Sequence, residues 1–209
     1  MSTSTTDMSP EQRVNMVFEL LQTSSKKEHI DGEMTQLDHA LQAAQLAKND
    51  GADEETILAA LLLDIGSLIP LTEQRSDTPG KEGIGYKLTD MARTVGFHVC
   101  SVFRNLGFSN KTSELIESNV MAKRYILTVD PLYIDNSKPV TVSYAVLRGG
   151  QLSPTEMAEF EKDPLFKQKV QLAKWDAAAT KTTDITPPAL DTYRDMAIRN
   201  ILMSIRTLY

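Results

Sequence analysis

Residues 34–66 constrain the fold of this chain most, because they predict two consecutive helices that are apolar around most of their circumference. In the first helix, residues 35–49, leucines, alanines and His39 fill all but one narrow side. Such a helix packs in the middle of a bundle, so we expect His39 to be buried. Gly51 suits the end of this helix, and Asp53 can cap the next one. The polar stripe of the first helix consists of Asp38, Gln42, Gln45 and Asn49.

The second helix of the pair carries a carboxylate, Asp64, inside an apolar run. An unpaired buried carboxylate is strongly destabilising, so Asp64 should lie near a cation or strong hydrogen-bond donors. A second carboxylate, Asp176, shares a helix side with Leu172 and is expected to point inward. With His39, these two could form a facial site for a single divalent metal. The alternative is that Asp64 caps a neighbouring helix and Asp176 lies at the surface beside Trp175.

Composition favours an ordinary intracellular globular protein. The 209 residues are 41% hydrophobic and 24% charged, which suits one packed core. The net charge of -6 and the lack of a basic run argue against a nucleic-acid partner. A single cysteine suits a reducing compartment, and no stretch has the character of a signal peptide or a membrane span. We therefore expect a soluble, cytoplasmic protein with a small-molecule substrate, and a homodimer is one option for its assembly.

The remainder of the chain predicts further helices separated by turns. Residues 1–8 form a polar tail that we expect to be disordered, and residues 9–209 form one domain of about seven to nine helices. A polar segment at 71–86 resembles a lid, a binding loop or a mobile excursion, and the sequence does not choose among them. Residues 140–147 alternate as a strand does, but the lack of a partner strand favours a helix or an irregular segment.

Two further pairs of side chains are candidates for chemistry. His98 and Cys100 could form a base and a thiol nucleophile. Positions two apart on a helix point about 160° to 200° away from each other, which favours a small buried cysteine and an unrelated histidine. Lys123 and Arg124 could bind an anion such as phosphate or carboxylate, or could form a solvated basic turn.

Several segments, taken in order over roughly residues 14–199, resemble one known family. They are QLDHALQAA, GADEETILAALLLDIG, FRNLGFS, VMAKRYIL, RGGQLS, and KWDAAAT followed by TDITPP. Together they are similar to the HD-domain diiron oxygenases that cleave aminophosphonates, the 2-amino-1-hydroxyethylphosphonate dioxygenase type. The resemblance implies an all-α fold, a single HD-domain helical bundle. In that family four histidines and two aspartates hold two irons.

The resemblance carries only part of this ligand set over to the present chain. His39 matches the first histidine, Asp64 the bridging aspartate and Asp176 the last aspartate. Lys123 matches a substrate-binding lysine. One iron position would therefore keep three of four ligands, while the other would keep Asp64 alone. The metal site is degenerate by this correspondence, and we do not expect a diiron centre.

Other family positions are occupied by residues that do not match. Leu63 stands where the histidine of the His–Asp pair is expected, and Val95 and Asn119 stand at or near the two remaining histidine positions. His98, three positions from Val95, would reach the site only if the helix register shifted. The remaining departures are Ser67 for a substrate-contacting histidine, Ala173 for an arginine near Trp175, and His29 and Gly32 near the tyrosine and glutamate that guard the family's site.

Three functions are compatible with this sequence. The one we favour is a metal-independent isomerase, cyclase or lyase without a cofactor, in the biosynthesis of secondary metabolites, because Leu63 and Val95 suit an apolar pocket. His39, Asp64 and Asp176 would then be its catalytic acid–base groups. A second option is a single-metal HD-type oxygenase or hydrolase with iron or another divalent metal on the same three residues, and a third is a non-catalytic ligand-binding protein. The predicted substrate contacts are Lys123, Asn119, Leu63, Val95, His29 and His98.

Overall fold

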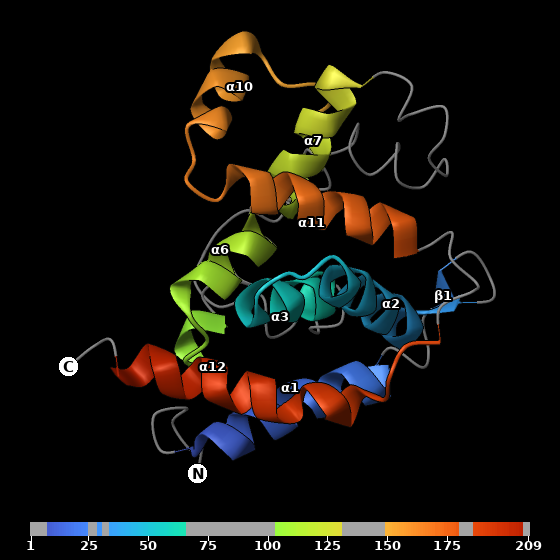
Figure 1. Cartoon of the computed structure of the whole chain (residues 1–209), viewed down its shortest axis with the longest axis vertical. Helices are drawn as coiled ribbons and strands as arrows, with labels where there is room; N and C mark the ends of the chain where they lie inside the picture. Colours follow the sequence, from blue (N-terminus) through green and yellow to red (C-terminus); the bar gives the residue numbers. More distant parts are fainter. Residues whose placement is uncertain are drawn as a thin grey trace, which may run out of the picture.

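The described part of the chain is a helical bundle (Figure 1). The computed structural model describes residues 8–24, 29–30, 34–65, 103–130, 149–179 and 186–206. Its helices are α1 (Pro10–Ser24), α2 (Gln36–Asn49), α3 (Glu54–Leu62), α6 (Asn110–Glu117), α7 (Asn119–Val129), α10 (Pro154–Glu161), α11 (Phe166–Ala179) and α12 (Arg194–Arg206), with a 3-10 turn, η3 (Leu190–Tyr193). Two-residue strands β1 (His29–Ile30) and β2 (Met34–Thr35) pair antiparallel. The prediction of an all-α fold is confirmed.

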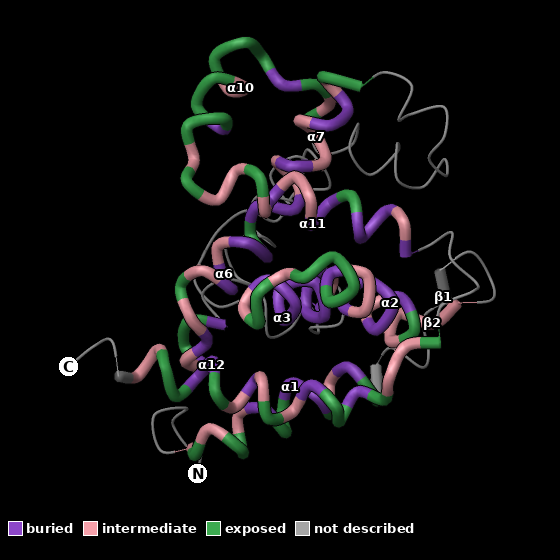
Figure 2. Tube along the Cα trace, in the orientation of Figure 1, coloured by how far each residue is buried: buried purple, intermediate pink, exposed green. Residues whose placement is uncertain are grey.

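Helices α2 and α3 form the centre of the bundle, as their apolar sequences predict. In Figure 1 they lie between α11 on one side and the α1–α12 pair on the other, and contacts between residues of these helices agree with this order. Nearly every residue of α3 is buried, so its trace in Figure 2 is purple from Thr56 to Leu62. Each fully buried leucine there contributes about 1.5–3 kcal/mol relative to an exposed one.

Local capping fixes where the two central helices begin and end. Thr35 caps α2 through a box with Asp38, and Asp53 caps α3 by accepting a hydrogen bond from the Thr56 amide at 3.0 Å. Gly51 has a φ of 75°, the left-handed conformation that lets the chain turn between the helices. Because this turn is tight, α2 and α3 pack against each other, and His39 of α2 contacts Asp64, which follows the end of α3.

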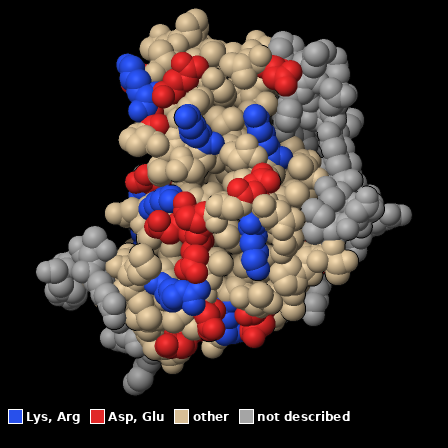
Figure 3. Space-filling view, viewed as in Figure 1, with Lys and Arg blue, Asp and Glu red and all other residues tan. Residues whose placement is uncertain are grey.

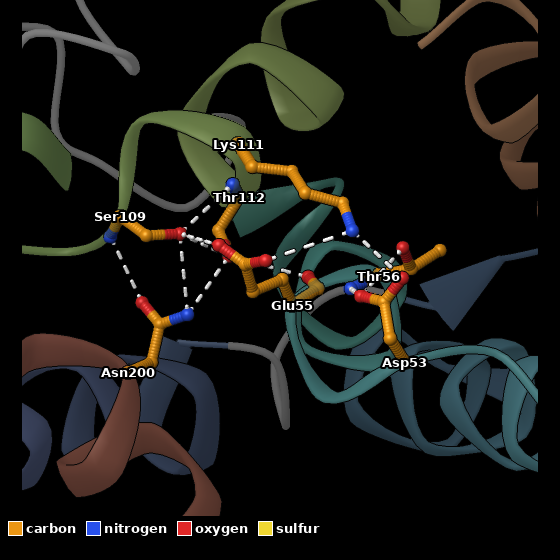
Figure 4. A network of polar contacts seen from close by, with 7 residues as sticks. All are labelled: Asp53, Glu55, Thr56, Ser109, Lys111, Thr112 and Asn200. Carbon is orange, nitrogen blue, oxygen red and sulfur yellow. Dashed lines mark hydrogen bonds and ion pairs between the residues drawn. The ribbon is translucent and has the colours of Figure 1, made fainter. Parts of the chain in front are cut away.

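A network of polar contacts joins α3, α6 and α12 (Figure 4). Asn200 of α12 accepts from the Ser109 amide at 2.9 Å and donates to the Thr112 hydroxyl at 3.1 Å. Ser109 donates in turn to Glu55 at 2.6 Å. Lys111 pairs with the exposed Asp53 at 2.7 Å. Figure 3 shows positive and negative side chains interspersed on the face that it draws. The network ties the start of α3 to two neighbouring helices.

A second, smaller apolar cluster connects α7, α10 and α11. Its buried members are Ala122, Ile126, Phe160 and Ala173. Ala173, which stands at the family's arginine position, therefore packs among apolar side chains. This cluster fixes α7 against α11, and that contact positions the site described below.

Several predictions concern residues that are not described. They include nearly all of the tail at 1–8, the segment at 71–86, residues 140–147, and both His98 and Cys100. Within the described ranges, no helix combines the length and the apolar character needed to span a bilayer.

Candidate metal centre

Three side chains from separate parts of the sequence meet where α2, the end of α3 and α11 come together. His39 Nδ1 lies 3.4 Å from Asp64 Oδ2, and His39 Nε2 lies 3.4 Å from Asp176 Oδ1. Each of the three residues offers one atom that could bind a metal, and these three atoms lie within 4.8 Å of one another. His39 and Asp176 are each 5% exposed, so the alternative that Asp176 lies at the surface is wrong. Asp64 faces His39, and its side chain is 32% exposed.

The two nitrogens of His39 have different partners. Nε2 donates to the backbone carbonyl of Asp176 at 2.9 Å. This carbonyl is among the last four of α11, which lack amide partners within the helix and carry partial negative charge. Because the carbonyl can only accept, Nε2 carries a proton and Nδ1 is the nitrogen left for Asp64 or for a metal.

Charge in the metal-free site favours a protonated His39. Burial lowers the pKa of His39, but contact with Asp64 and the charge of Asp176 outweigh burial and raise the pKa to about 9. A metal bound at Nδ1 would replace the proton there.

Asp176 uses its two carboxylate oxygens differently. Oδ2 lies 2.5 Å from Nζ of Lys123, whose side chain is only 10% exposed. Oδ1, on the His39 side, has no hydrogen-bond partner among the described residues. Its contact with His39 Nε2, at 3.4 Å, is an ion pair without a hydrogen bond, so this atom fits a site in which a bound group completes its coordination.

Lys123 and its neighbour Arg124 have separate surroundings, although a joint anion site was one interpretation of the sequence. Arg124 donates to the backbone carbonyl of Gly150 at 3.0 Å and pairs with Glu156 at 3.1 Å. It therefore anchors the segment that leads into α10, while Lys123 points to Asp176.

Leu63 and Asn119, the two described residues at unmatched histidine positions, are buried, and neither is a ligand of the kind that iron requires. Leu63 belongs to the main hydrophobic core, and its contact with a substrate stays a prediction. Asn119 is 6% exposed and has a carboxamide oxygen without a hydrogen-bond partner in the described structure. Among the described residues, His39, Asp64 and Asp176 form the one group of at least three side chains suited to a metal.

Some predicted residues cannot be placed, and one polar residue was missed. Val95 and His98 lie outside the described residues, and for His29 the description covers its backbone pairing with Thr35 but not its side chain. Gln42, which the sequence places in the polar stripe of α2, is buried, and its side-chain oxygen has no hydrogen-bond partner among the described residues. Nothing in the local sequence separates Gln42 from the exposed members of that stripe.

Comparisons with known proteins show which curated sequences this chain is similar to. No family model matches the chain. It is 34% identical to hydroxymethylphosphonate dioxygenase of Gimesia maris over 184 residues, which cover 88% of this chain and 86% of the relative. It is 29% identical to [1-hydroxy-2-(trimethylamino)ethyl]phosphonate dioxygenase (glycine-betaine-forming) of Leisingera caerulea, over 77% of this chain and 76% of that one. It is also 31% identical to the uncharacterized protein L432 of Acanthamoeba polyphaga mimivirus, over 90% of this chain and 81% of that protein.

The helical bundle and the His–Asp–Asp cluster are what is expected of an HD-domain protein, and the two relatives with a named activity are enzymes. The chain belongs to the HD-domain oxygenase family that includes these phosphonate dioxygenases.

The comparisons contradict the function that we favoured from the sequence. The two relatives with a named activity are dioxygenases, so a metal-independent isomerase, cyclase or lyase is the wrong class. The expectation of no cofactor is wrong for the same reason, since enzymatic reactions of O₂ generally use a metal or an organic redox group. The three lost ligand positions received too much weight, and the findings favour the oxygenase alternative, in which His39, Asp64 and Asp176 hold a metal.

Proposed function

We propose that this protein is a metal-dependent oxygenase of small organophosphonates and that His39, Asp64 and Asp176 hold one metal ion. One observation carries the proposal. Asp176 Oδ1 is buried without a hydrogen-bond partner among the described residues, inside a cluster whose ligand atoms lie within 4.8 Å of one another. A divalent cation is the species that satisfies an imidazole and two carboxylates at once.

The donor set fits one divalent iron. Two carboxylates and a neutral imidazole balance its charge, and three protein ligands leave positions for substrate and oxygen. A bound iron would supply the activation of O₂ that organic substrates alone do not provide. The described residues offer no second group of this size, so we propose a single metal and not a pair.

The protein side chains around this site would orient its components. The Asp176 carbonyl fixes the orientation and the tautomer of His39, and Lys123 fixes Asp176 through Oδ2. Burial of His39 and Asp176 excludes water from this side of the site. Lys123 also brings a buried positive charge to it, which suits an anionic phosphonate.

The reaction we propose is oxidative cleavage of the carbon–phosphorus bond of an α-hydroxyphosphonate. One oxygen atom of O₂ ends on carbon, which becomes a carboxylic acid, and the other ends on phosphorus, which leaves as phosphate. The substrate supplies all four electrons, so no external reductant is needed. The names of the two dioxygenase relatives support this choice, since one is glycine-betaine-forming from a 1-hydroxyphosphonate.

Anaerobic titration with Fe(II) after removal of metals by a chelator tests the proposal. We expect one equivalent to bind to the wild type, and His39→Gln or Asp176→Asn to weaken binding by about 10²-fold or more. Asp53→Asn is the matched control, because Asp53 lies in the network of Figure 4 and pairs with Lys111. Phosphate release from hydroxymethylphosphonate should follow metal content. Equal iron binding by all four proteins would contradict the assignment of the ligands.

A further inference from the structure

Asn119 is a buried polar residue that the metal site does not use. It is 6% exposed, and its Oδ1 has no hydrogen-bond partner among the described residues. It is the first residue of α7, but the N-cap position belongs to Ser118, so helix capping does not account for it. Burying a carboxamide oxygen without a donor is destabilising, and such atoms require an explanation.

The position of Asn119 relates it to Lys123 and the metal cluster. The two residues are four apart on α7, so their side chains are neighbours on one helix face. A long side chain in a helix points back over the preceding turn, which for Lys123 is the turn of Asn119. The ammonium of Lys123 contacts Asp176 on α11, and α7 packs against α11 (Figure 1). Asn119 is therefore on the side of α7 that faces the cluster.

The chemistry of the unpartnered atom limits what can bind to it. An amide oxygen accepts hydrogen bonds and cannot donate them, so its partner must carry an O–H or N–H group. A phosphonate group, fully ionised or nearly so, is mainly an acceptor and would bind to Lys123 in preference. A hydroxyl or amino group on the carbon next to phosphorus has the donor that Asn119 lacks.

We propose that Asn119 determines substrate specificity by accepting a hydrogen bond from a hydroxyl or amino group next to the phosphonate. This inference rests on the proposed function and adds to it the residue that recognises the hydroxyl or amino group next to the phosphonate. The substrate would lie with its phosphonate toward Lys123 and its donor toward Asn119. Phosphonates that lack the donor would leave the amide oxygen unsatisfied and would bind more weakly.

Calorimetry on iron-loaded protein without oxygen tests the inference with two probes, hydroxymethylphosphonate and methylphosphonate, which differ by one hydroxyl. We expect wild type to prefer the hydroxylated probe by about tenfold. Asn119→Leu should reduce the preference to near one, mainly through the hydroxylated probe. Asn119→Ala, which cannot overpack the site, provides the same comparison.

Thermal unfolding of the metal-free proteins gives a readout independent of iron and substrate. Because Asn119→Leu removes an unsatisfied buried oxygen, its Tm should rise by about 2–4 °C. Asn200→Leu is the control, a buried asparagine whose groups are all bonded within the network of Figure 4, and its Tm should fall.

The possible failures are distinguishable. A wild type that binds neither iron nor either probe overturns the proposed function, and this inference falls with it. If the wild type and the Asn119 variants prefer hydroxymethylphosphonate over methylphosphonate equally strongly, the inference is overturned but the proposed function is not. Failure of both Asn119 variants to fold would also overturn it, because the oxygen would then have a structural role.

Discussion

Two regions of the molecule join three parts of the chain through polar side chains: the network at α3, α6 and α12, and the candidate metal centre. They differ in whether their buried polar atoms have hydrogen-bond partners. In the network, both ends of the Asn200 carboxamide are bonded. At the metal centre, Asp176 Oδ1 has no hydrogen-bond partner in the described structure, and neither does Asn119 Oδ1 nearby on α7. A network that is complete within the protein stabilises the fold. At the proposed metal centre, a bound metal ion and substrate would supply the missing partners.

The largest expected effect on stability comes from Asp176. Asp176→Ala removes the carboxylate that lies 2.5 Å from Lys123 Nζ and 3.4 Å from His39 Nε2, while Asp64 still contacts His39. Loss of one partner from a buried ion pair costs about 3–5 kcal/mol. Urea unfolding of the metal-free protein measures this loss. A cost below about 1 kcal/mol would mean that the charges are not coupled as the distances imply.

Metal binding should stabilise the incomplete centre and leave the complete network unaffected. A ligand that binds only the folded state raises the free energy of unfolding by about 2.7 kcal/mol at 100 times its Kd. We expect this increase from anaerobic Fe(II) in wild type and in Asn200→Leu, and its absence in His39→Gln. Chemical denaturation with and without iron provides the measurement. Equal stabilisation of His39→Gln would remove His39 from the ligand set.

Removing a bonded partner from the network should be costly without iron. Asn200→Leu deprives the part-buried Ser109 amide of its acceptor and the buried Thr112 hydroxyl of a donor. Leaving such groups unsatisfied costs about 1–3 kcal/mol. If Asn200→Leu proved as stable as wild type in urea, the contrast between the two regions would fail.

The smallest expected effect concerns the exposed edge of the network. Burial acts to raise the pKa of Asp53, but its bonds to Lys111 and Thr56 outweigh this effect and lower the pKa below the ordinary value of 3.8. The unfolded chain then binds a proton at higher pH than the folded one, so Asp53 stabilises the fold above pH 3.8, and this contribution is lost as the pH falls through the lowered value. Asp53→Asn retains a capping side chain and should cost about 0.2–1 kcal/mol at pH 7, with the difference disappearing in strong acid. A difference that persisted unchanged at low pH would exclude the charge as its cause.

Much of the fold followed from local patterns. The apolar circumference of residues 35–49, the Gly51 turn and the Asp53 cap predicted the central helix pair, because these signals act within one or two helical turns. The grouping of His39, Asp64 and Asp176 depended on burial arguments and on the family resemblance.

Long-range packing explains what could not be predicted. Gln42 has the sequence environment of a surface residue, yet it is buried. The helix that carries it, α2, packs against α11, which is far away in the sequence. Arg124 is adjacent to Lys123, and only the approach of residues 149–151 gives it a separate structural role. The function that we favoured was wrong because the sequence shows which metal ligands have been replaced. Whether the remaining residues can still bind a metal depends on the distances between them, which the sequence does not give.

The hydrogen bond from His39 to the carbonyl of Asp176 has an evolutionary consequence. Its acceptor belongs to the main chain, so a substitution at position 176 that preserves the helix changes a candidate ligand but leaves the carbonyl in place. The histidine would keep its orientation while side chains around it are exchanged one at a time. During evolution, such a centre can lose individual ligands while the His39 ring keeps the orientation that it needs to bind a metal. If this protein binds a single metal as proposed, a change in metal number would therefore not require the site to be rebuilt at each step.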